Sequence, residues 1–167
     1  MPGSLHAWYS LYDLEALAER EAKISGEIEL RQLTRLRDLL HSDTGSVQAS
    51  LRFSRRASVD VTAELKFDTT VDLICQRCLE PMHHRVSEEV SLVLLAQDST
   101  HGDRDNVREA VVLNSEKLKP ASLIEDELIV SLPIVPRHER IDECGKIAQT
   151  LQAFAPGGAS RGADPAS

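Results

Sequence analysis

Residues 47–67 read VQASLRFSRRASVDVTAELKF, and this stretch determines the expected fold. Apolar and polar side chains alternate over Val47–Phe53 and again over Val59–Phe67. A period of two places alternate side chains on opposite faces of a β-strand. Because one set is apolar and the other polar, each run predicts a strand with one buried face and one face in water, as in antiparallel sheets.

Further strands are predicted after this pair. A turn is expected at Asp68-Thr69, a third strand at Val71–Cys75, and a short strand at Ala110–Leu113 after a polar loop at Gln97–Arg108. A fourth strand lies between these, and the following residues share one phase of it: His84, Val86, Val90, Leu92 and Leu94.

Two helical stretches are predicted before the strands. Asp13 can cap a helix over Leu14–Lys23, which has one apolar side. The second stretch covers residues 33–40, whose leucines share a face, and it ends before Gly45.

A third helix is predicted from Ser122. Ser122 and Glu125 have the spacing of a capping box, in which each side chain satisfies the other residue's backbone N–H. Pro133 ends this helix, because the residue before a proline is disfavoured in the helical region. The acidic triplet Glu125–Glu127 then lies in the first turn, where the helix dipole favours carboxylates. This position explains the triplet without a metal-binding or general-acid role.

Together these elements predict an α+β fold: an antiparallel sheet flanked by helices, with a knuckle-like CxxC turn and a disordered C-terminal tail. The predicted organisation is an N-terminal helical extension at 1–25, an α+β domain at 26–150 and a tail at 151–167. The tail is rich in Gly, Ala, Ser and Pro, which cannot bury a core.

The charge balance limits how this chain can bind nucleic acid. Its 167 residues include 19 basic and 27 acidic side chains, which gives a net charge of −8 at pH 7. A protein that binds RNA through phosphates needs basic groups, so any RNA contact must use a local basic patch or a basic protein partner. The candidate RNA- or partner-binding arginines are Arg52, Arg55 and Arg56 around the first hairpin and Arg77 in the CxxC turn. The alternative is that these arginines are simply solvated.

The same sequence predicts a cytoplasmic protein with no membrane partner. No apolar stretch approaches the roughly 20 residues needed to span a bilayer. The N-terminus lacks the basic start and apolar run of a secretory signal. Three cysteines are an odd number, which does not suit a secreted disulfide framework.

The most specific local pattern is Cys75-Gln76-Arg77-Cys78, at the end of a predicted strand. Two thiols at this spacing can reach one tetrahedral metal ion. His138 and Cys144, after the last helix, can complete a structural zinc site of three cysteines and one histidine. No other cofactor is expected.

Three alternatives to this site remain open. His83 or His84, just beyond the turn, could replace a ligand. The cysteines could be inert thiols without metal. A thioredoxin-like redox role is also conceivable, although that chemistry needs a helix beginning at the motif, and Pro81 and the β-like run after it argue against one.

No motif of a common enzyme class is present. The sequence lacks the P-loop, GxGxxG, HExxH and GxSxG patterns. No Ser, Cys or Lys has an obvious adjacent base. We therefore expect a protein that is not an enzyme.

Two motifs resemble the bacterial YceD family, whose members are called large ribosomal RNA subunit accumulation proteins. The first is VDLICQRCLEPM at Val71–Met82, and the second is LIEDELIVSLPIVPRH at Leu123–His138, followed by Cys144. The resemblance covers roughly Gly26 to Cys144. The matching positions are Cys75, Arg77, Cys78, Glu125, Asp126, Glu127, Leu132, Pro133, Pro136, His138 and Cys144.

The resemblance implies a ribosome biogenesis factor that promotes accumulation or processing of large-subunit ribosomal RNA by binding. Its partner would be either the precursor of that RNA, bound through local arginines, or a basic ribosomal protein. Many members have a more ordered, often basic C-terminal end, which this chain lacks after Phe154. The alternative function is a thiol- or zinc-responsive regulatory protein that uses Cys75 and Cys78.

Overall fold

The computed structural model describes residues 3–56, 60–96, 110–113, 117–146, 150 and 153. The loop predicted at Gln97–Arg108 and, apart from Ala153, the tail predicted at 151–167 lie outside these residues. The elements in chain order are β1 (Tyr9–Ser10), α1 (Leu11–Glu19), β2 (Lys23–Glu29), a 3-10 turn (Leu30–Gln32), α2 (Thr34–Arg37), β3 (Ser46–Arg56), β4 (Asp60–Ile74), β5 (Pro81–Ala96), β6 (Ala110–Leu113), β7 (Lys117–Leu118), α3 (Pro120–Ser131) and a 3-10 turn (Ile141–Cys144). The predicted α+β class is confirmed.

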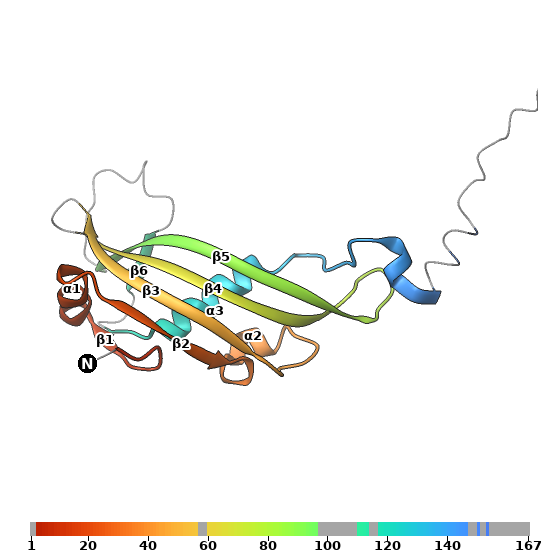
Figure 1. Ribbon diagram of the computed structural model, residues 1–167, viewed down its shortest axis with the longest axis horizontal. Coiled ribbons are helices and arrows are strands. Elements are labelled where there is room, and N and C mark those ends of the chain that lie inside the picture. The colour runs from red at the N-terminus through yellow and green to blue at the C-terminus, as the bar shows by residue number, and fades with distance from the viewer. Residues whose placement is uncertain are drawn as a thin grey trace, which may run out of the picture.

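One five-stranded sheet forms the body of the molecule (Figure 1). Its strand order is β2-β3-β4-β5-β6, and the first three pairings are antiparallel, as the alternating sequence predicted. β6 is the exception, because it pairs parallel to β5. The short strands β1 and β7 pair separately. β2 covers Lys23–Glu29, so the boundary predicted at residue 26 lies inside this strand.

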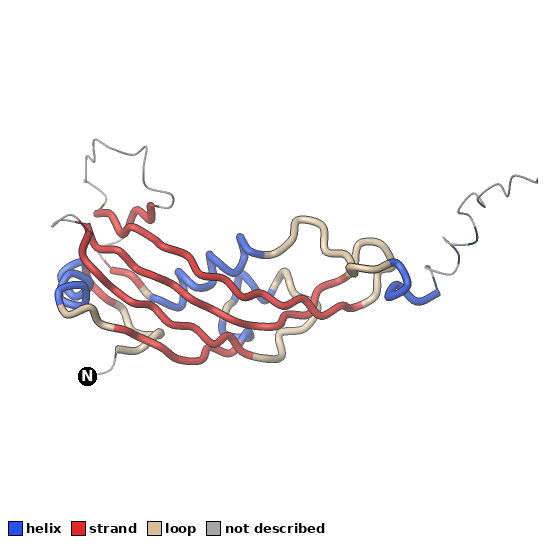
Figure 2. The backbone as a smooth tube through the Cα atoms, turned by 45° about the horizontal axis from the view of Figure 1, so that its top comes forward, coloured by secondary structure: helices blue, strands red, loops and turns tan. Residues whose placement is uncertain are grey.

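Among the described residues, the helices cover one face of the sheet. The buried face of β3 and β4 presents a continuous apolar row, which includes Leu51, Phe53 and Leu65. Leu14 of α1 and Leu128 of α3 are fully buried in the same core. Figure 2 shows the helices in blue beside the red strands. The other face carries the polar half of the alternation, which stays in water.

The predicted turn at Asp68-Thr69 is wrong, because β4 continues through it as a single strand of 15 residues. Thr69 is buried and donates a hydrogen bond from Oγ1 to the carbonyl of Ser46 at 2.9 Å. Asp68 lies on the open face and forms an ion pair with Arg85 at 2.9 Å. A β-branched threonine suits a strand, and the apolar alternation on either side keeps its phase across it.

α1 begins earlier than predicted. Ser10, not Asp13, is its N-cap, and Asp13 is the third helical residue of a reciprocal capping box. The helix ends at Glu19, and Glu21 takes a positive φ of 49° that turns the chain into β2. The second predicted helix is also shorter, because 33–40 contains only the four-residue α2.

α3 begins at Pro120, so the predicted capping box of Ser122 with Glu125 is wrong. Lys119 is the N-cap and makes no side-chain capping bond, while Pro120 occupies the first turn. Proline suits this position, because the first helical N–H groups lack partners within the helix. The predicted end is confirmed: Leu132 is extended, directly before Pro133. No helix among the described residues is long and apolar enough to cross a membrane.

Candidate metal centre

A tight turn joins β4 to β5 and carries the CxxC motif. The N–H of Leu79 donates to the carbonyl of Cys75 at 2.8 Å, and the N–H of Cys75 donates to the carbonyl of Glu80 at 3.0 Å. Leu79 has a φ of 60°, which L-residues other than Asn and Asp rarely adopt. The turn therefore holds its two cysteines, Cys75 and Cys78, in a fixed arrangement, and both are buried.

The segment after α3 is brought against this turn (Figure 1). Residues 133–140 form neither helix nor strand, and the N–H of Gln76 donates to the carbonyl of Pro136 at 2.8 Å. A 3-10 turn then follows, and Gly145 after it has a positive φ of 55°. These features place Cys144, which is fully buried, beside the CxxC turn.

Four metal-ligand atoms meet there. The sulfurs of Cys75, Cys78 and Cys144 and one ring nitrogen of His138 all lie within 4.8 Å of one another. Nδ1 of His138 is 3.5 Å from the sulfur of Cys78 and 3.6 Å from that of Cys144. Tetrahedral zinc, with bonds of about 2.3 Å to sulfur and 2.0–2.1 Å to nitrogen, would hold these atoms about 3.6 Å apart. The donor set and its spacing can therefore hold a metal ion.

The thiols differ in how easily they ionise. Burial opposes ionisation of Cys75, but the backbone N–H groups of Cys78, His138 and Arg77 donate to its sulfur and lower its pKa to about 5. Burial raises the pKa of the Cys144 thiol to about 11, and the neighbouring sulfurs of Cys78 and Cys75 add to the increase. Three crowded thiols cannot all become thiolates unless a cation joins them.

Arg77 supplies a positive charge beside the cluster. Its guanidinium donates to the sulfur of Cys144 at 3.9 Å. Three thiolates with one divalent ion carry a net negative charge, which a guanidinium at this distance offsets. The predicted partner-binding role of Arg77 stays a prediction.

The structure thus brings together the four residues predicted as ligands. His83 and His84 do not belong to this cluster among the described residues. His83 instead pairs with Asp72 through Nδ1 at 2.5 Å. The predicted replacement of a ligand by either histidine has no support from this arrangement.

The arginines of the first hairpin have acidic neighbours. Arg52 pairs with Glu21 at 3.6 Å and Arg55 with Glu19 at 3.1 Å. The side chain of Arg56 lies outside the described part of the chain. A phosphate at Arg52 or Arg55 would compete with these carboxylates, and their RNA-binding role stays a prediction.

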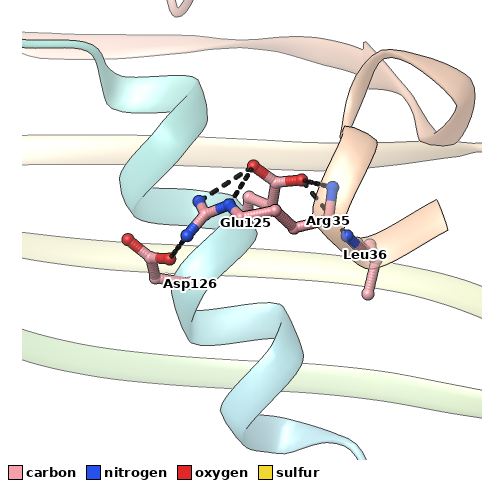
Figure 3. Close-up of polar contacts among 4 residues, drawn as sticks. All are labelled: Arg35, Leu36, Glu125 and Asp126. Atoms are coloured by element: carbon pink, nitrogen blue, oxygen red, sulfur yellow. Dashed lines mark hydrogen bonds and ion pairs between the residues drawn. The ribbon is translucent and has the colours of Figure 1, made fainter. Parts of the chain in front are cut away.

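Sequence reasoning missed a second polar junction, shown in Figure 3. Glu125, buried in α3, accepts hydrogen bonds from the backbone N–H groups of Arg35 at 2.7 Å and Leu36 at 3.2 Å. It thereby caps α2 from another element, because α2 has no side-chain cap of its own. The Arg35 guanidinium also binds Glu125 at 2.9 Å and Asp126 at 2.5 Å. Nothing in the sequence indicated this contact, because Glu125 and α2 lie about ninety residues apart in the chain.

The fold and the cluster define a class: small α+β proteins in which a buried thiol and imidazole site joins a sheet to the segment after the last helix. Residues 63–156, more than half of the chain, match the family model described as Large ribosomal RNA subunit accumulation protein YceD. The chain belongs to the YceD family, which confirms the resemblance of the two motifs.

One relative resembles this chain over about four fifths of its length. The Large ribosomal RNA subunit accumulation protein YceD of Haemophilus influenzae is 29% identical over 133 residues. These residues make up 79% of this chain and 76% of the relative. No solved structure matches this chain.

Proposed function

We propose that this protein promotes the accumulation of large-subunit ribosomal RNA, and that it does so by binding rather than by catalysis. The description of the family supports a role in the accumulation of this RNA. The observation that carries the binding role is the cluster itself: its three thiols are buried, so they are poorly placed to attack a substrate. The protein then acts in the cytoplasm on precursor particles of the large subunit.

We further propose that the metal is zinc and that its role is structural. Three sulfurs and one imidazole would fill all four positions of a tetrahedral site and leave none for water, so the site would be closed. The ion would join the turn between β4 and β5 to a segment about sixty residues later in the chain, His138 in particular. It would fix the position of that segment instead of supplying a reactive group.

The function is tested in cells that lack the gene. We expect mature large-subunit RNA to fall relative to small-subunit RNA, and the tagged protein to sediment with precursor particles of the large subunit. Complementation with wild type restores the ratio. An unchanged RNA ratio together with sedimentation only at the top of the gradient would contradict the proposed function.

The binding mode is tested separately with purified protein and precursor RNA. Under the proposal, incubation leaves the RNA intact and yields a complex whose affinity falls with salt. Cleavage or modification of the RNA that Cys75→Ser abolishes would show catalysis instead.

A further inference from the structure

A cleft of about 500 Å³ lies directly beside the cluster. One wall is the beginning of β5, from Met82 to Arg85, and the other is the segment after α3, from Pro133 to His138. β6 pairs with β5 only from Val93 onward, so the first half of β5 is free of a neighbouring strand on this side among the described strands. The cleft therefore lies between a sheet edge and a segment that the cluster holds in place.

Two arginines without carboxylate partners lie at this end of the molecule. Among the arginines whose side chains are described, only Arg20, Arg77 and Arg137 have no carboxylate within 4.0 Å. Arg77 faces the cluster, and Arg137 is exposed and lines the cleft. Arg137 is thus available for an anion that no part of the described chain supplies.

A second arginine faces the same cleft from β5. Arg85 lines it and pairs with Asp68, but the two side chains are 73% and 49% exposed. An exposed pair contributes little free energy, so Arg85 can exchange Asp68 for a phosphate, which a guanidinium binds through two hydrogen bonds. The guanidiniums of Arg85 and Arg137, which belong to the two walls, can bind one backbone phosphate or two adjacent ones.

The remaining lining fits the rest of a nucleotide. Val135 and Met82 offer apolar surface, and His84 offers an imidazole plane on which a base can stack. Glu139 and Glu143 also line the cleft, where carboxylates can accept hydrogen bonds from the N–H groups of a base edge. A site for phosphate alone would not need these acceptors, and a volume of this size suits a small ligand.

We infer that this cleft binds an unstacked nucleotide of single-stranded RNA, with Arg137 and Arg85 on its phosphate. The inference rests on the proposed function and assigns the site through which the protein binds RNA. Because one wall of the cleft ends at His138, the cluster holds that wall beside β5, so both arginines line the same cleft.

Fluorescence anisotropy tests this with a labelled single-stranded RNA of mixed sequence, about 16 nucleotides long. Each phosphate contact contributes a slope of about −0.7 to log K against log salt. Arg137→Gln and Arg85→Gln should therefore each weaken binding about fivefold at 0.1 M salt and flatten the slope by about 0.7. Arg20→Gln is the matched control: Arg20 follows the last residue of α1, is exposed and, like Arg137, has no carboxylate partner among the described residues. This variant makes the same charge change away from the cleft, and its binding should stay within about twofold of wild type.

Different failures have different meanings. If the wild type binds this RNA and both cleft variants bind like Arg20→Gln, the cleft is not the contact, although the proposed function stands. If the wild type binds no RNA at any salt concentration, direct RNA binding itself is overturned. Tighter binding of an acidic peptide than of the RNA, lost in Arg137→Gln, would show that the occupant is a protein segment and also overturn the inference. Unchanged melting and metal content of each variant exclude unfolding as the cause.

Discussion

Two polar junctions hold this fold together between segments far apart in the sequence, and they differ in where their positive charge comes from. Glu125 of α3 meets its cation, Arg35, within the chain (Figure 3). The cluster of Cys75, Cys78, His138 and Cys144 gathers donors that all favour a cation, but Arg77 reaches only one sulfur, at 3.9 Å. The first junction is complete without any ion. The second requires a metal for its thiols to be ionised together, so the stability of that end should depend on solution conditions.

The largest expected effect is the loss of the metal. Cys144→Ser should abolish stoichiometric zinc binding, because serine is a poor zinc ligand. At free zinc 1,000 times above the dissociation constant, the bound ion contributes about 4 kcal/mol to the free energy of unfolding, and this contribution would be lost. Thermal unfolding with and without a chelator measures it.

Gln76→Ala is the matched control for this change, because Gln76 lies in the same turn with an exposed side chain. It should keep the metal and the melting temperature. Full metal content in Cys144→Ser, or a wild-type melting temperature that is unchanged by the chelator, would contradict the account.

The next effect belongs to the junction that needs no metal. Glu125→Ala removes a buried carboxylate and leaves the N–H groups of Arg35 and Leu36 without acceptors. We expect a loss of about 2–3 kcal/mol, since part of the Arg35 side chain stays in water. Denaturant unfolding should give the same loss in zinc and in chelator, because distant sites add. A loss that vanishes in chelator would mean that the two junctions are coupled.

A smaller effect is expected at the cation beside the cluster. Arg77→Gln should weaken zinc binding about tenfold, as removal of a group that supports metal ligands does. Competition with a chromogenic chelator measures the affinity. Arg140→Gln, whose guanidinium pairs with Asp142, is the control and should stay within about twofold. Equal losses of zinc affinity in both variants would show that Arg77 acts only through its charge and not through its contact with the cluster.

The smallest effect is expected at the exposed part of the Glu125 junction. Asp126→Asn removes the second ion pair of Arg35, in which both side chains are about half exposed. Such pairs contribute less than about 1 kcal/mol, so urea unfolding should shift only slightly. A loss as large as that of Glu125→Ala would show that the guanidinium, and not the capping of α2, holds the two helices together.

The contrast between the junctions also explains what the sequence could predict. The cluster was predictable because cysteine and histidine at these spacings have few other uses together. Glu125 was not, because the start expected at Ser122 placed it in a first helical turn, where the dipole explains a carboxylate. α3 in fact begins at Pro120 and has no acidic residue in its first turn, and nothing local indicates that α2 lacks a cap. A long-range hydrogen bond to a backbone N–H leaves no mark on residue periodicity.

The sheet shows the same limit. Alternation predicted the strands of the core, since Val47–Phe53 and Val59–Phe67 repeat with period two. It could not separate a turn from a continuing strand at Asp68-Thr69, because both residues are polar and Asp favours turns. The fact that decides it, the hydrogen bond of the buried Thr69 to Ser46, comes from the neighbouring strand.

The claim on which the account depends is that one metal ion joins Cys75, Cys78, His138 and Cys144. X-ray absorption at the zinc edge, on protein purified without added metal, tests it most directly. The account predicts one zinc per chain, with three sulfur neighbours at about 2.3 Å and one nitrogen at about 2.0–2.1 Å. Protein that purifies without metal and takes up none, or zinc surrounded only by oxygen and nitrogen, would contradict it.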